Sequence, residues 1–113
     1  MGGQTFRVEV AATDATREQG LSGRTTLPAD SGMWFALPAP GLHGFWMKDM
    51  NFPIDLVWIS PDHEVLGSIR LPPCGSYACP VYYPPSPATY VLEVNAGSFT
   101  GQPGDRAGWF CAP

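Results

Sequence analysis

The residues best suited to chemistry gather in one segment, Phe45–Asp55. Its first half reads as a strand, and successive side chains of a strand alternate between two faces. Phe45 and Met47 therefore share one face, which we expect to meet the core. Trp46 and Lys48 share the other face, so that a large ring and the only lysine of the chain point outward together.

This outward-facing pair has two interpretations. In the first, it forms a ligand shelf: the Trp46 ring stacks on a flat apolar or sugar-like surface, and the Lys48 ammonium holds an anionic or hydroxyl group. In the second, Lys48 pairs with Asp49, Asp55 or Glu93 across a loop, and Trp46 only covers the end of the fold. The residues alone leave both interpretations open.

Asp55 is a further candidate, because it directly precedes the apolar run 56–59. A carboxylate at the mouth of a strand can accept hydrogen bonds from backbone amides, and we expect Asp55 to cap the preceding loop in this way. A catalytic role would require Lys48 or another charge to tune its ionisation or its geometry. Lys48 and Asp55 would then be the acid–base pair of a hydrolase or lyase.

Glutamates and histidines elsewhere give weaker signals. Glu9 and Glu93 lie on the polar sides of predicted strands; paired carboxylates can perform acid–base catalysis, but solvated strand faces carry glutamates routinely. His43 and His63 have no histidine or cysteine at a metal-ligand spacing. The sequence contains no nucleophile elbow, phosphate-binding loop or dinucleotide fingerprint. We therefore predict no metal site and no cofactor.

A proline-rich loop carries Tyr77, Tyr82 and Tyr83. Tyrosine offers a large contact area at a small loss of conformational entropy, so this loop can flank a binding groove. The alternative is a rigid lid that packs over the fold with its hydroxyls in water. The complete set of ligand-binding candidates is Trp46, Lys48, Asp49, Asp55, Tyr82 and Tyr83.

Composition limits the class of protein that carries these residues. The chain has 113 residues with 13 glycines and 13 prolines, but 44% of residues are hydrophobic and 12% aromatic, which argues against disorder. The length fits a single domain, residues 5–113, preceded by a short remnant or disordered N-terminus at 1–4. No stretch approaches the ~18 apolar residues of a membrane span. A net charge of −4 with scattered arginines argues against nucleic acid as the partner.

Short alternating segments between Gly and Pro clusters predict a mainly β fold, a small antiparallel sandwich or barrel of about seven short strands with one or two short helices. We expect strands at 5–11, 33–37, 43–47, 55–60, 64–71, 88–94 and 106–110.

The connections between these strands also have sequence signals. Thr13 and Asp14 can cap a short helix over 15–19, which Gly20 ends. A tight turn at 60–63 makes a hairpin of the two strands that flank it. Prolines at 38–41 are expected to stop the second strand, and six prolines between 72 and 87 predict irregular structure there.

Cys74 and Cys79 flank four residues of the proline-rich loop. This separation can close a disulfide, which would stabilise the fold by about 2 kcal/mol and would imply an oxidising compartment. Two reduced structural thiols are the main alternative, since the C-x4-C spacing does not fit a zinc knuckle. Cys111 is expected to be a small buried hydrophobic side chain.

Several motifs of this chain follow a known pattern: Gly32–Phe35, Phe45–Asp55, Tyr90–Gly97, Glu9, Ala11, Thr13, Arg17, Gly20-Leu21, Cys74, Cys79–Tyr82 and Gly104-Asp105. They resemble the bacterial and archaeal domain-of-unknown-function family numbered 192, over nearly the whole chain. The sequence departs from that pattern at Ser22, where methionine is usual, and at Asp49-Met50, where Asn-Thr is usual. The resemblance implies a small all-β fold, often exported behind a signal peptide or lipoprotein leader, with no established activity.

The leading hypothesis is a non-enzymatic ligand-binding or accessory module with an opening lined by aromatic residues and lysine. We expect a periplasmic or secreted location, with a signal segment in the natural precursor. Its partner would be an unidentified small molecule or a component of the cell envelope. The alternatives are the hydrolase or lyase that uses Lys48 and Asp55, and a structural or protein-interaction domain.

Overall fold

The computed structural model describes residues 3–75 and 78–108, and within them seven strands form two sheets beside one six-residue helix. In chain order the elements are β1 (Arg7–Ala11), α1 (Asp14–Gln19), β2 (Ser31–Gly41), β3 (Phe45–Trp46), β4 (Ile54–Ile59), β5 (Val65–Leu71), β6 (Val81–Tyr82) and β7 (Ala88–Asn95).

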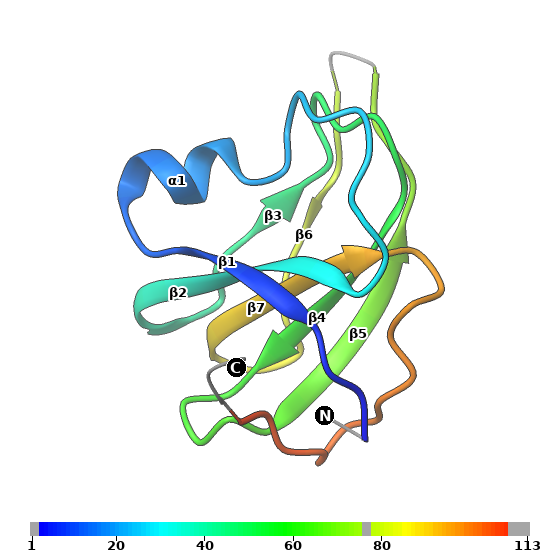
Figure 1. The fold of residues 1–113 in the computed structure, drawn as a ribbon. Coiled ribbons are helices and arrows are strands. Elements are labelled where there is room, and N and C mark those ends of the chain that lie inside the picture. The colour runs from blue at the N-terminus through cyan, green and yellow to red at the C-terminus, as the bar shows by residue number, and fades with distance from the viewer. Residues whose placement is uncertain (1–2, 76–77, 109–113) are drawn as a thin grey trace.

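The larger sheet has the strand order β1-β2-β7-β4-β5, and β3 pairs with β6 in a second, two-stranded sheet. All pairings are antiparallel except that of β1 with β2, which is parallel. In Figure 1, α1 and the β3–β6 pair both lie above the larger sheet. Because β1 and β5 remain separate edges of one open sheet, the fold is sandwich-like, and the barrel alternative is wrong.

Both faces of the larger sheet are covered, so its central strands are buried on both sides. All six residues of β4 are buried. Leu56 and Trp58 point into a first core with Phe35 and Val91, while Val57 and Ile59 point into a second core with Trp34 and Leu92. The first core lies beneath α1, β3 and the segment 47–50, and we call this side of the sheet the helix face. The second core includes Phe99 and packs against Phe6, Val8 and Ala107. We call this side of the sheet the terminal face.

The helix and the hairpin form where the sequence predicts them. Thr13 Oγ1 accepts a hydrogen bond from Thr16 N at 3.1 Å, Thr16 Oγ1 accepts one from Thr13 N at 3.0 Å, and Gly20 ends the helix. The β4–β5 hairpin turns at Ser60, whose carbonyl accepts from His63 N at 2.9 Å.

Three predicted strands differ from the structure. β2 continues through Pro38 and Pro40 to Gly41, because the β2–β7 ladder is interrupted between Ala36 and Gly41 and needs no amide donor there. β3 contains only two residues, and its partner β6 lies in the loop predicted to be irregular.

The predicted last strand does not form over its described residues, 106–108. Arg106 makes a single bridge with Glu64, and the preceding residues bond to the β4–β5 turn, with Val65 N donating to Asp105 O at 2.8 Å. Residues 109 and 110 of this predicted strand, and Cys111, lie outside the described residues.

Candidate functional site

A cavity of about 320 Å³ opens on the helix face, between α1 and β3. Its walls come from the end of α1 and the residues after it, from β2, from the β2–β3 connection with β3, and from β7. The lining residues are Arg17–Ser22, Phe35, Leu37, His43–Trp46, Met50 and Glu93.

The wall next to β2 is apolar. The Phe35 and Phe45 rings meet edge to face, with their centroids 5.3 Å apart. Gly20 borders this wall with φ +48°, and an added Cβ would lie 3.3 Å from Phe35 Cζ. The glycine therefore ends the helix in a conformation open to glycine and lets the chain pass close to the ring.

Glu93 is the buried carboxyl of this cavity. It sits in the middle of β7, with Met33 of β2 and Leu56 of β4 as its register partners. Only 6% of its surface is exposed, and no donor or cation among the described residues binds its carboxyl. Burial raises the pKa of Glu93 from 4.5 to about 8, so the carboxyl is mostly protonated at pH 7.

The polar side chains at the mouth of the cavity are already engaged. The Arg17 guanidinium donates to Ala12 O at 2.7 Å and Ala36 O at 3.0 Å, and forms an ion pair with Asp14 at 2.7 Å. Gln19 Nε2 donates to Ser22 O at 2.7 Å. Glu93 therefore differs from these neighbours in having no partner among the residues that the structure describes.

Trp46 and Lys48 face outward while Phe45 and Met47 meet the first core, as the alternation predicts. Trp46 is 53% exposed and lines the cavity, and Lys48 Nζ lies 5.3 Å from the centre of its ring. No ion pair of Lys48 is found over residues 3–75 and 78–108. The lysine thus interacts with the Trp46 ring and not with Asp49, Asp55 or Glu93.

Asp55 lies on the terminal face and accepts three hydrogen bonds. Its Oδ1 accepts from Arg70 Nε at 2.9 Å, and its Oδ2 accepts from Gly97 N at 2.9 Å and Phe99 N at 3.1 Å. The expected capping of amides is present, but the capped loop follows β7 and does not precede β4. The structure does not bring Asp55 to Lys48.

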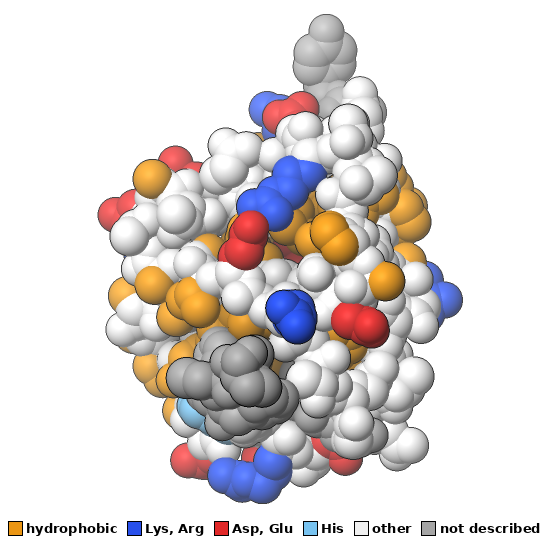
Figure 2. Space-filling view, viewed as in Figure 1, with side chains coloured by type: hydrophobic (Ala, Val, Ile, Leu, Met, Phe, Trp, Pro, Cys, Tyr) orange, Lys and Arg blue, Asp and Glu red, His pale blue; other side chains and the backbone are white. Residues whose placement is uncertain are grey.

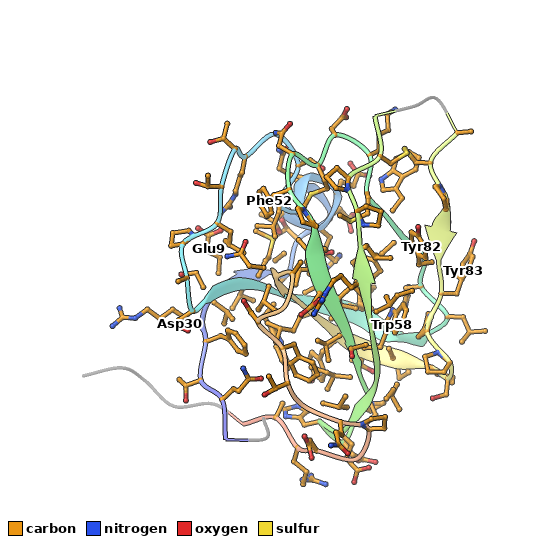
Figure 3. The ribbon with its side chains drawn as sticks, turned by 90° about the vertical axis from the view of Figure 1, so that its right-hand side faces the viewer. Glu9, Asp30, Phe52, Trp58, Tyr82 and Tyr83 are labelled. Carbon is orange, nitrogen blue, oxygen red and sulfur yellow. A yellow bond between two sulfur atoms is a disulfide. The ribbon has the colours of Figure 1, made fainter. Side chains whose placement is uncertain are left out.

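Tyr82 and Tyr83 lie next to each other on one side of the molecule, with Tyr83 further out (Figure 3). Tyr82 pairs with Phe45 and packs against the first core, whereas Tyr83 is 61% exposed. Neither residue lines the cavity. Tyr77 lies outside the described residues.

Cys74 and Cys79 form a disulfide. Cys74 N donates to Met47 O at 3.3 Å, and Cys74 forms an isolated parallel β-bridge with Lys48. The loop that the disulfide closes therefore lies along the segment that carries the lysine. Asp49 follows in a turn with φ +63°, and its carbonyl accepts from Gly23 N at 3.0 Å. Asp49 is exposed and does not line the cavity.

Figure 2 shows acidic and basic side chains interspersed over one face of the molecule. Residues 3–75 and 78–108 contain no group of three His, Cys, Asp or Glu side chains placed to hold a metal ion. In the same part of the chain, no helix has the length and apolar character needed to cross a membrane.

The family model of DUF192, described as "Uncharacterized ACR", matches residues 1–109. The chain belongs to this family. A comparison with curated proteins found no match.

Two solved structures are similar to this chain in fold and in sequence. One is a protein of unknown function from Novosphingobium aromaticivorans, with TM-score 0.80 and 30% identity over 92% of this chain and 75% of that chain. The other, from Sinorhizobium meliloti, is described as a "putative transcription regulator", with TM-score 0.77 and 33% identity over 88% of this chain and 78% of that chain.

The sequence pattern did not single out Glu93 as a site residue. Its alternation with Leu92 and Val94 predicts a solvent-exposed polar face. The useful signal is that Val91, two residues earlier, shares the face of Glu93 and is apolar. A strand with apolar residues on both faces is a central strand, so its glutamate is expected to be covered.

Proposed function

We propose that this domain binds a small organic molecule in the cavity between α1 and β3, without catalysing a reaction. The observation that carries the proposal is the buried Glu93 carboxyl, which faces the cavity and has no partner among the described residues. Buried polar groups in folded proteins are nearly always hydrogen-bonded. A ligand in the cavity would supply the partner that this carboxyl lacks.

The size and lining of the cavity support the same conclusion. Its volume of about 320 Å³ is at the lower end of the ~300–1,000 Å³ typical of small-molecule sites. Such sites combine apolar walls with a few polar groups that fix orientation. Here Phe35, Phe45 and Leu21 form the walls, and Glu93 is the orienting group.

Of the ligand-binding residues predicted from the sequence, Trp46 is the one that lines the cavity. Its exposed ring borders the opening, where a ligand can stack on it. Lys48 would assist by holding the ring from its solvent side, and Tyr82 by fixing β3 through the β3–β6 pairing. Asp49, Asp55 and Tyr83 lie outside the lining and are not part of the proposed site.

Binding is favoured over the hydrolase or lyase alternative because the side chains that such a reaction would use are already hydrogen-bonded within the protein. Ser22 is the hydroxyl-bearing residue of the lining, and its Oγ donates to Lys48 O at 3.1 Å. Asp55 is occupied by Arg70 and two amides on the terminal face. The acid–base pair that this alternative needs is therefore not assembled.

An extracytoplasmic location is part of the proposal, because disulfides persist in oxidising compartments. The Cys74–Cys79 bridge supports it, and so does the resemblance to an often exported family. Gene regulation is not proposed, since the net charge is −4 and the face seen in Figure 2 has interspersed charges instead of a basic patch for phosphates.

The test is a thermal-shift and calorimetric screen of sugars, nucleotides, acids, peptides, amines and alcohols against the wild-type chain. Trp46→Ala and Tyr83→Ala form a matched pair, because both remove an exposed aromatic ring but only Trp46 lines the cavity. We expect at least one compound to bind the wild type and Tyr83→Ala alike, and to bind Trp46→Ala about tenfold more weakly. Binding by no compound, or equal loss in both variants, would refute the proposed site.

A further inference from the structure

The charges around Glu93 indicate which class of molecule the cavity accepts. We infer that the ligand is a small organic cation, in which a primary ammonium group is attached to a compact apolar body. This inference rests on the proposed function and deepens it. In the bound state the ammonium group contacts the Glu93 carboxylate, and the apolar body lies against the aromatic walls.

The charge that lines the cavity without a partner is acidic. Four ionisable side chains face this space: Arg17 and Glu18 from α1, His43 from the β2–β3 connection, and Glu93 from β7. The Arg17 charge is compensated by Asp14 and two backbone carbonyls. Neither Glu18 nor Glu93 forms an ion pair over residues 3–75 and 78–108, so Glu18, and Glu93 once it is ionised, attract a cation and repel an anion.

The histidine does not offset this acidic character. His43 Nε2 lies 2.8 Å from Ala39 O, so this nitrogen donates to the carbonyl of its own turn. The Lys48 ammonium is exposed and lies over the Trp46 ring. Arg17 and Lys48, the cations at the border of the cavity, therefore contact groups other than Glu93, and no described cation pairs with its carboxyl.

The aromatic lining adds to this preference. Phe35 and Phe45 form the aromatic part of the wall, and Trp46, whose ring is exposed, is a further lining residue. Ring faces attract cations, and the attraction strengthens where water is excluded. A primary ammonium has three donors, so it can bond both carboxylate oxygens, whereas an alcohol offers one donor.

Binding of a cation requires Glu93 to give up its proton. The free site holds the neutral acid, the complex holds the carboxylate beside the ammonium, and the proton passes to the solvent. Burial raises the pKa of Glu93 to about 8, so affinity for a cation increases as pH rises toward 8. From pH 6 to pH 8 the ionised fraction of the free site grows about 50-fold, and the affinity grows by the same factor.

The experiment compares isosteric probes by isothermal titration calorimetry on the wild-type chain: phenethylamine, phenethyl alcohol and phenylacetate. We expect phenethylamine to bind best at pH 8, with an affinity about 50-fold higher than at pH 6 and with the release of close to one proton near pH 7. The affinity for phenethyl alcohol should not change with pH, and phenylacetate should bind weakest. Glu93→Gln should remove the preference for the amine and its pH dependence, while Glu64→Gln, an exposed glutamate on the β5 side, should leave both intact.

The outcomes separate the inference from the proposed function. If phenethyl alcohol or another neutral compound binds at the Trp46 cavity as well as the amine at pH 8, the cation inference is wrong and the binding function stands. The same holds if amine affinity is independent of pH. If no probe and no compound of the wider screen binds, both fail.

Discussion

Asp55 and Glu93 lie on neighbouring strands of the five-stranded sheet, but their carboxyls face opposite sides of it. Asp55 is the register partner of Val94, and Leu56 is the register partner of Glu93, so one residue of offset separates the two faces. Asp55 accepts hydrogen bonds from Arg70, Gly97 and Phe99, whereas the Glu93 carboxyl has no donor among the described residues. The two carboxyls are almost equally buried. We expect Asp55 to contribute to stability, and we propose Glu93 for binding.

Replacing Glu93 by Gln should change how stability depends on pH. Because burial raises its pKa to about 8, the folded chain keeps a proton that the unfolded chain loses above about pH 4.5. The free energy of unfolding contributed by this group therefore falls as pH rises from about 4.5 to about 8. Glu93→Gln has no proton to lose, so it should match the wild type near pH 5 and become more stable than it by several kcal/mol at pH 8 to 9.

Urea denaturation of both chains across this pH range measures the difference directly. Glu64→Gln is the control, because Glu64 is exposed and its ion pair with Arg106 lies on the surface. A difference between Glu93→Gln and wild type that stays constant from pH 5 to pH 9 would contradict the burial argument.

Replacing Asp55 by Ala should destabilise the fold by about 3 kcal/mol, because it leaves the Gly97 and Phe99 amides without their acceptor. Arg70→Ala should cost less than about 1 kcal/mol, since Arg70 is 63% exposed and the carboxylate keeps its two amide donors. Chemical denaturation of the two variants provides the measurement. Equal losses would mean that the ion pair, and not the amide capping, anchors the loop after β7.

Removal of the disulfide should lower stability by about 2 kcal/mol, as expected for closing a loop of this size. The double variant Cys74→Ser/Cys79→Ser makes the change, and thermal unfolding against the non-reduced wild type measures it. Mass analysis of the wild type without reductant should find the two cysteines two hydrogens lighter than the dithiol. A fully reduced pair in protein made under oxidising conditions would overturn both the bridge and the argument for an extracytoplasmic location.

Replacing Gly20 by Ala should destabilise the fold by roughly 1–3 kcal/mol. Gly20 has φ +48° and ψ −134°, and an added Cβ would lie 3.3 Å from Phe35 Cζ. Gly67→Ala is the matched control, because its added Cβ meets only Pro85 Cγ at an ordinary 3.6 Å. Thermal unfolding should separate the two variants clearly; a Gly20→Ala chain as stable as Gly67→Ala would show that the helix end tolerates a side chain.

The short helix and the β4–β5 hairpin could be predicted from the sequence because the patterns that specify them involve neighbouring residues. The Thr13 cap, the Gly20 stop and the turn at Ser60 each depend on a few consecutive positions, and all three are present. The strand β6 was missed because Val81 and Tyr82 become a strand only through pairing with Phe45 and Trp46. Likewise, the predicted end of β2 at Pro38 was wrong. The strand continues to Gly41 because β7 makes no ladder hydrogen bond with β2 between Ala36 and Gly41.

The sequence by itself determined the mainly β fold class, the disulfide spacing and the outward pairing of Trp46 with Lys48, because alternation and short-range spacing fix these features. Its motifs carried the family resemblance. Tertiary structure alone decided that Asp55 and Glu93 face opposite sides, and that Glu93 meets the cavity beside Trp46. The physical reason is that burial depends on tertiary packing: β7 lies in the centre of the sheet between β2 and β4, and two cores formed with segments distant in sequence cover its two faces. A glutamate that looks solvated in its own strand thereby becomes the buried carboxyl of the candidate site, with no partner among the described residues.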